Sequence, residues 1–150
     1  LDEPDYKLLR FTRHLIHLRR DHPVMRRRRF LEGPARRGGE SELGEIEWLT
    51  PAGESMTDQD WTTWYARAMM VFLNGEAIAE PDERGQRIVD DSFLVLINAS
   101  DEDITFTLPG EGCAPPPVLA ADDPVVVEAR SMLFLIDAPE SAATTERHQR

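Results

Sequence analysis

Residues 88–99 read Ile-Val-Asp-Asp-Ser-Phe-Leu-Val-Leu-Ile-Asn-Ala, and this stretch decides the fold that the sequence predicts. Five consecutive apolar residues, Phe93 to Ile97, lie between turn-forming residues, which is typical of a buried β-strand. Successive side chains of a strand point to opposite faces of its sheet, so the odd-numbered residues share one face and the even-numbered residues the other. Both faces are apolar here, and each therefore needs a covering layer.

Turn signals divide the chain around this strand into further short apolar segments. Other strands are expected over residues 44–50, 67–73, 104–108, 125–129 and 132–136. Their spacing predicts an antiparallel β-sandwich, with Phe93, Val95 and Ile97 inside it beside Phe106. Asn74-Gly75 is a hairpin-turn signal.

The first 20 residues predict an amphipathic helix from about residue 4 to residue 20. Its apolar stripe is Leu8, Phe11, Leu15 and Leu18, and Pro23 prevents its continuation. We expect this helix to pack near the sandwich. The predicted organisation is a helix and connection over 1–37, with a flexible joint at 36–39, then the sandwich over 38–138 and a disordered tail over 139–150.

Charge is distributed unevenly along the 150 residues, whose formal net charge is −11. Residues 1–37 carry 11 Lys and Arg against 5 Asp and Glu, whereas residues 38–150 carry 6 against 23. Such an acidic body would repel nucleic acid, so the run Arg26 to Arg29 is expected to pair with acidic partners across an interface.

Compartment and processing follow from a few sequence features. A single cysteine, Cys113, excludes an internal disulfide framework and fits a reducing compartment. No apolar run approaches the roughly 18 residues of a membrane span. The acidic start of the chain does not resemble a signal peptide, and it suggests a piece of a longer protein.

A search for catalytic motifs yields no catalytic residue, no cofactor site and no metal site. Carboxylates cluster beside turns and strand ends, at 58/60, 90/91, 101–103 and 122/123. Glycoside hydrolysis requires two carboxylates that face each other across a cleft, whereas solvated acids are ordinary at turns. A loop calcium site, or a helix site on His14, His17 and Asp21, is the less favoured alternative.

Three tryptophans allow two roles. Trp48, together with Trp61 and Trp64 on an expected helical turn after Thr57, could form a platform on which sugar rings stack. The favoured interpretation is that they fill the sandwich or its junction with a neighbouring domain.

Several stretches, in this order and spacing, resemble the end of the catalytic barrel and the following domain of bacterial glycogen debranching enzymes, which are isoamylase-like members of the α-amylase family. They are Leu-Leu-Arg-Phe-Thr-Arg at 8–13, Leu-Arg-Arg-Asp-His-Pro-Val at 18–24, Ile-Glu-Trp-Leu-Thr-Pro-Ala-Gly at 46–53, Met-Thr-Asp-Gln-Asp-Trp at 56–61, Val-Phe-Leu-Asn-Gly at 71–75 and Asp-Asp-Ser-Phe-Leu-Val-Leu-Ile-Asn-Ala at 90–99. The resemblance covers roughly residues 5–110. It departs around residues 115–124, where the family has a longer stretch with a tryptophan, so either this loop is shortened or residues are missing near 110–124.

The resemblance implies a mainly β chain, with a C-terminal antiparallel β-sandwich preceded by one helix from the end of the barrel. It also implies a cytoplasmic parent enzyme that hydrolyses α-1,6 branch linkages of glycogen or limit dextrins. The catalytic carboxylates of the family lie upstream, so the chain by itself is expected to be no enzyme. Expected partners are the barrel and, for the isolated chain, a second copy, with no nucleic acid or membrane. The alternative is an independent carbohydrate-binding module that contacts α-glucan through the tryptophans.

Overall fold

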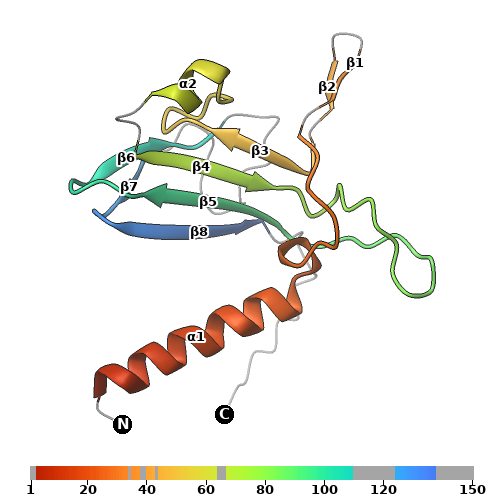
Figure 1. Ribbon diagram of the computed structural model, residues 1–150, viewed down its shortest axis with the longest axis horizontal. Helices are drawn as coiled ribbons and strands as arrows, with labels where there is room; N and C mark the ends of the chain where they lie inside the picture. The colour runs from red at the N-terminus through yellow and green to blue at the C-terminus, as the bar shows by residue number, and fades with distance from the viewer. Residues whose placement is uncertain are drawn as a thin grey trace, which may run out of the picture.

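Two β-layers form the body of the protein, and one long helix precedes them (Figure 1). The computed structural model describes residues 3–33, 35–37, 40–42, 44–63, 67–109 and 124–137. The elements are α1 (Glu3–Asp21), the 3-10 helix η1 (Pro23–Met25), β1 (Ala35–Arg37), β2 (Glu40–Glu42), β3 (Ile46–Leu49), α2 (Asp58–Thr62), β4 (Ala68–Leu73), β5 (Ser92–Asn98), β6 (Ile104–Thr107), β7 (Pro124–Val127) and β8 (Ser131–Asp137).

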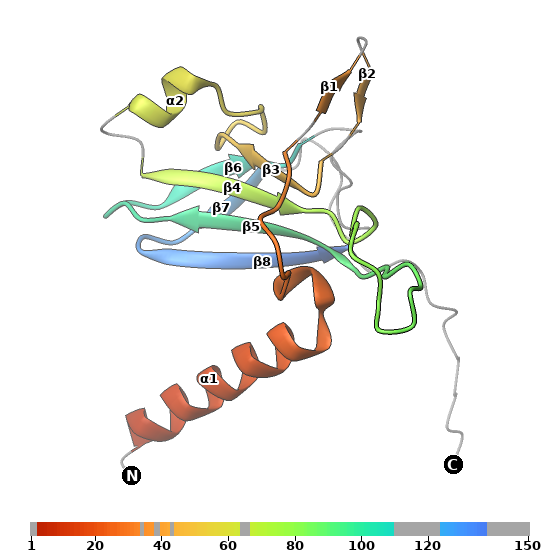
Figure 2. The same cartoon turned by 45° about the vertical axis from the view of Figure 1, so that its right-hand side comes forward.

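The larger layer is a four-stranded antiparallel sheet in the order β3-β4-β5-β8. β5 is paired on both sides, with Val95 opposite Val71 of β4 and Phe134 of β8. The antiparallel pair β6-β7 forms the second layer, behind the first in Figure 2. The predicted fold class, mainly antiparallel β with a sandwich-like core and one preceding helix, is confirmed.

The main core lies between these two layers and uses the even-numbered residues of β5. Leu94 and Leu96 are buried there against Phe106 and Leu108. The prediction that Phe93, Val95 and Ile97 face the inside is therefore wrong, because the strand is apolar on both faces and alternation alone could not tell which face is inside. Phe106 is buried in the core as predicted.

A second apolar cluster forms on the other face of the sheet, at the start of β5. Phe93 is fully buried there by Val24 of η1 and by Ile78 from the connection between β4 and β5. The ring of His22 lies edge-on to Phe93, with centroids 4.8 Å apart. This cluster attaches the segment after α1 to the sheet, because η1 supplies the cover that Phe93 needs.

Asn74-Gly75 does not form the predicted hairpin. The strands that it follows and precedes, β4 and β5, are paired, but the connection between them runs from residue 74 to residue 91. A Cβ atom at Gly75 would collide with the backbone carbonyl oxygens of Asp90 and Asp91. Glycine is needed here because two backbone segments approach closely, and not because a tight turn requires it.

The far end of β5 is fixed by one buried side chain. Asn98 is 1% exposed, and its Nδ2 donates to the backbone carbonyls of Glu102, Val127 and Glu128. Its Oδ1 accepts hydrogen bonds from the backbone N–H and the hydroxyl of Ser100. A single amide therefore joins the end of β5 to the turn before β6 and to the end of β7.

The helix α1 has the predicted extent and ends before Pro23. It runs away from both sheets in Figures 1 and 2, so the expectation that the helix packs near the sandwich is wrong for most of its length. Among the described residues, no helix is long and apolar enough to cross a membrane.

Residues 36 and 37 of the expected flexible joint belong to β1, which pairs with β2 so that Arg37 is opposite Glu40, and residues 38 and 39 lie outside the described ranges. The predicted boundary after residue 37 coincides with the end of β1. Several expectations concern residues outside the described ranges: Trp64, Cys113, Asp122, Asp123, the stretch at 110–123 and the tail at 139–150.

Candidate docking face

The face of the four-stranded sheet that points away from the main core is apolar throughout, and we call it the outer face. Its residues are Ile46, Trp48, Met69, Val71, Leu73, Phe93, Val95, Ile97, Met132, Phe134 and Ile136. The central Val71 and Val95 are shielded by their neighbours, whereas the edge strand β8 presents Met132, 53% exposed, and Ile136, 41% exposed. The described layers leave this edge of the outer face uncovered.

An apolar cavity of about 490 Å³ continues the outer face toward the segment after η1. Ile46, Trp48 and Leu73 line it from the sheet, and Phe30 and Leu31 line it from the segment after η1. Phe30 is 97% exposed. A phenyl ring in water beside an apolar cavity extends the uncovered surface beyond the sheet, and contiguous surfaces of this kind mark protein interaction sites.

The apolar stripe of α1 is also uncovered. Leu8 and Phe11 are each more than half exposed, Leu15 is 37% exposed, and Leu18, near the end of the helix, packs against the second apolar cluster. An amphipathic helix of this length gains most of its stability from burying its stripe. The outer face, the apolar cavity and the stripe of α1 together form a large candidate docking surface.

Buried ion pairs attach residues 26–29, which follow η1, to the sandwich. Nη2 of Arg27 donates to Oε1 of Glu45 at 2.5 Å, and Nε of Arg27 donates to Oε2 of Glu80 at 2.6 Å. Nη2 of Arg29 donates to the same oxygen of Glu45 at 2.7 Å. Arg26 to Arg29 were expected to pair with acidic partners across an interface, but Arg27 and Arg29 find these partners within the chain.

Electrostatics hold this network in its charged form. Burial would raise the pKa of Glu45, but the backbone N–H of Glu32 and the guanidinium of Arg27 lower it below its usual value. Burial would likewise lower the pKa of Arg27, and the hydrogen bonds to Glu80 and Glu45 raise it. The side chains of Arg27 and Glu45 are only 5% and 7% exposed, so each requires the charge of the other.

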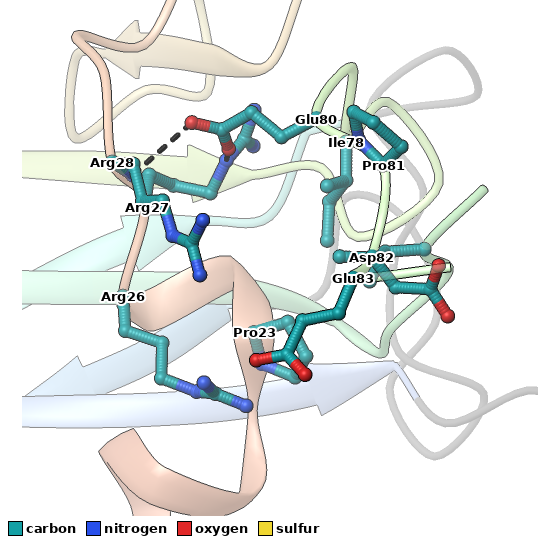
Figure 3. A pocket seen from close by; sticks show the side chains of 10 residues that line it. Pro23, Arg26, Arg27, Arg28, Ile78, Glu80, Pro81, Asp82 and Glu83 are labelled. Carbon is teal, nitrogen blue, oxygen red and sulfur yellow. Dashed lines mark hydrogen bonds and ion pairs between the residues drawn. The ribbon is translucent and has the colours of Figure 1, made fainter. Parts of the chain in front are cut away.

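A second cavity, of about 580 Å³, lies between residues 23–28 and the loop that contains residues 78–88 (Figure 3). Arginines line one side and acidic residues the other. Glu80 is held by Arg27, and Oδ1 of Asp82 accepts from the backbone N–H groups of Arg84 and Gln86. Both carboxylates therefore accept hydrogen bonds from nearby groups of the chain and stabilise the local structure.

A cluster of three side chains, which we call the hinge cluster, joins the end of α1 to the start of β5. Nδ1 of His22 donates to Oδ1 of Asp90 at 2.9 Å, and Oδ2 of Asp91 lies 3.7 Å from the same nitrogen. The backbone N–H of Val24 donates to Oδ2 of Asp90 at 2.8 Å. Sequence reasoning did not select His22, because 68 residues separate it from Asp90. The only signal was that both residues lie in stretches that carry the family resemblance.

Two of the three selected tryptophans come together. The rings of Trp48 and Trp61 meet edge to face, with centroids 5.3 Å apart and an interplanar angle of 75°, and both are partly exposed. Trp61 lies on α2. Thr57 is the N-cap of this helix and forms a capping box with Asp60. Hydrogen bonds from the backbone and hydroxyl of Thr57 lower the pKa of Asp60.

The other selected residues are not gathered into a site in the described part of the chain. His14 and His17 are exposed on α1, and Oδ1 of Asp21 accepts from Nε of Arg20 at 3.0 Å. Asp101 lies 3.6 Å from a guanidinium nitrogen of Arg67, on the surface.

Comparison with curated proteins identifies the family. The chain is 52% identical over 107 residues to the glycogen operon protein GlgX homologs of Mycobacterium tuberculosis and Mycobacterium bovis, and this match covers 71% of the chain. It is 30% identical over 126 residues, 83% of the chain, to the glycogen debranching enzyme of Cronobacter sakazakii. This chain is homologous to one segment of bacterial glycogen debranching enzymes. No family model matches the chain.

The resemblance to isoamylase-like glycogen debranching enzymes is thereby confirmed. The glycogen debranching enzyme of Dickeya chrysanthemi, 28% identical over 122 residues, gives a third match of the same extent. The chain spans about 15% of the length of the curated relatives that it matches.

Proposed function

We propose that this chain is the non-catalytic C-terminal β-sandwich region of a cytoplasmic glycogen debranching enzyme that hydrolyses α-1,6 linkages of glycogen or limit dextrins. Its role in that enzyme is to stabilise the catalytic barrel. The observation that carries the proposal is the uncovered apolar surface formed by the outer face, the apolar cavity and the stripe of α1. A soluble domain that works alone would have little reason to keep such a surface in water.

The size of the hydrophobic gain supports a domain contact. Covering a fully exposed large apolar side chain contributes roughly 1.5–3 kcal/mol. Phe30 is almost fully exposed, and Met132 and Ile136 are about half exposed. Burying these three with the stripe of α1 would supply several kcal/mol, which is comparable with the stability of a small domain.

The test uses the mycobacterial relative truncated by the segment that matches this chain, with this chain added as a separate polypeptide. We expect a complex, a higher melting temperature and recovery of α-1,6 hydrolysis on a branched glucan. Phe134→Asp on the outer face should prevent all three, whereas Thr105→Asp on the exposed side of β6 is the matched control. A truncated relative that is equally stable and active without the chain would overturn the proposal.

Two further results belong to the same proposal. The chain alone should release no reducing sugar from glycogen or pullulan, because acid and nucleophile would have to come from elsewhere. Its uncovered surface should also make the isolated chain self-associate, as a sedimentation coefficient that rises with concentration would report. A clean monomer at high concentration would argue against the docking surface.

The second candidate function is an independent carbohydrate-binding module on Trp48, Trp61 and Trp64. The partly exposed pair of Trp48 and Trp61 favours it, because an aromatic face can stack on a sugar ring. Electrophoresis through a gel that contains glycogen is the test. Retardation that Trp61→Ala abolishes would support this candidate, and equal mobility with and without glycogen would reject it.

A further inference from the structure

We propose that the hinge cluster of His22, Asp90 and Asp91 is a binding site for a divalent transition-metal ion, with Zn²⁺ as the best-fitting candidate. This inference goes beyond the proposed function and does not depend on it. The site would join the end of α1 to the start of β5, at the point where the helix meets the sheet (Figure 1).

The first argument is convergence. One ligand atom from each residue, Nδ1 of His22, Oδ1 of Asp90 and Oδ2 of Asp91, lies within 4.8 Å of the other two. Neighbouring ligands of a tetrahedral Zn²⁺, bound at about 2.0–2.1 Å, are about 3.3 Å apart. The distances from Nδ1 of His22, 2.9 Å to Asp90 and 3.7 Å to Asp91, lie on either side of that separation. The three ligand atoms are therefore already close to the spacing that a tetrahedral ion requires.

The second argument is charge. The side chains of Asp90 and Asp91 are 7% and 29% exposed, and two adjacent carboxylates with this little solvent repel each other. In the described part of the chain, the ion pairs of these two acids involve His22 and no lysine or arginine. A divalent cation would balance both carboxylates, which a single imidazole does not do.

The third argument is that the surrounding structure already orients the ligands. The backbone N–H groups of Val24 and Asp91 hold the carboxylate of Asp90, and the edge contact with Phe93 holds the ring of His22. Outer groups that orient ligands in this way are typical of metal sites. Binding to the metal requires Nδ1 of His22 without a hydrogen, so the bound imidazole would carry its hydrogen on Nε2. One imidazole and two carboxylates suit Zn²⁺ better than Ca²⁺ or Mg²⁺, which prefer oxygen ligands throughout.

Three protein ligands leave a fourth position for water or for a group from a covering domain. The ion would hold the end of α1 and the start of β5 in one geometry, since His22 directly follows α1 and both aspartates directly precede β5. It would thereby set the direction in which α1 leaves the sandwich.

The test is titration of the chain with ZnCl₂, followed by calorimetry and thermal unfolding. The parent for all titrations carries Cys113→Ser and His148→Gln, which remove a thiol and a histidine that could bind Zn²⁺ elsewhere. We expect one ion per chain and a melting temperature that rises with ZnCl₂ and falls again with EDTA. Asp91→Asn should weaken binding at least about tenfold, because loss of a group that merely orients a ligand already costs about 10–100-fold.

His17→Gln, on the exposed face of α1, is the matched control and should bind Zn²⁺ as the parent does. His22→Gln should weaken binding like Asp91→Asn. If circular dichroism shows that His22→Gln is unfolded without metal, Asp91→Asn decides, because it keeps the backbone hydrogen bond to Asp90. Absence of Zn²⁺ binding, or binding that survives Asp91→Asn unchanged, or equal loss in His17→Gln, would overturn the proposal.

Discussion

Replacing Arg27 by Met should destabilise the sandwich by about 3 kcal/mol, because it leaves Glu45 buried without its main counter-charge. Breaking a buried ion pair by removing one partner costs about 3–5 kcal/mol. We expect the lower end because Glu45 keeps Arg29 and the backbone N–H groups of Glu32 and Ala79. Met has a similar length, so little of the loss would come from packing.

Acid should weaken the same network, and the sign follows from the pKa directions. The pKa values of Glu45 and Glu80 are lowered from the usual 4.5 in the folded state, in both cases with a contribution from hydrogen bonds to Arg27. A carboxylate with a lowered pKa contributes stability above its unfolded pKa, and that stability is lost as the pH falls through the folded pKa. The parent should therefore lose stability below pH 4.5, and Arg27→Met should lose less over the same range.

The assay is urea unfolding followed by tryptophan fluorescence, at neutral pH and below pH 4.5. Glu45→Gln and the double variant complete a cycle, in which the double variant should be more stable than the sum of the single losses predicts. Arg20→Met is the control, since the pair of Arg20 and Asp21 is exposed and should contribute no more than about 1 kcal/mol. An Arg27→Met variant as stable as the parent at neutral pH would refute the argument.

Three other variants test separate features of the fold. Leu96→Ala should cost about 2–5 kcal/mol in urea unfolding because it opens a cavity in the main core, whereas Met132→Ala on the exposed edge of the outer face should cost far less; equal losses would mean that the core face is misassigned. Asn98→Asp should lower the melting temperature more at neutral pH than at pH 3, because a buried carboxylate would face three backbone carbonyls; a pH-independent loss would contradict this. Gly75→Ala should lower the melting temperature through collision with the backbone at Asp90, and a neutral result would show that the two segments can separate at little cost.

Sequence reasoning predicted most of the elements because their signals are local. The extent of α1 follows from its apolar spacing and from Pro23, and the turn after Thr57 follows from a capping pattern. The Asn74-Gly75 prediction failed because the same dipeptide serves a close backbone approach as readily as a hairpin. The family resemblance was also carried by local motifs, and the comparisons confirm it.

By itself, the sequence determined that β5 is a strand apolar on both faces, that a basic helix precedes an acidic β-rich body, and that no catalytic motif is evident. Only the tertiary structure decided which face of β5 enters the main core, because a pattern that is apolar at every position carries no information about direction. The ion network of Arg27 and the hinge cluster of His22 and Asp90 were likewise decided by folding. The paired residues are 18 to 68 positions apart in the sequence. Such contacts depend on how the segment after α1 lies against the sheet, which no local pattern encodes.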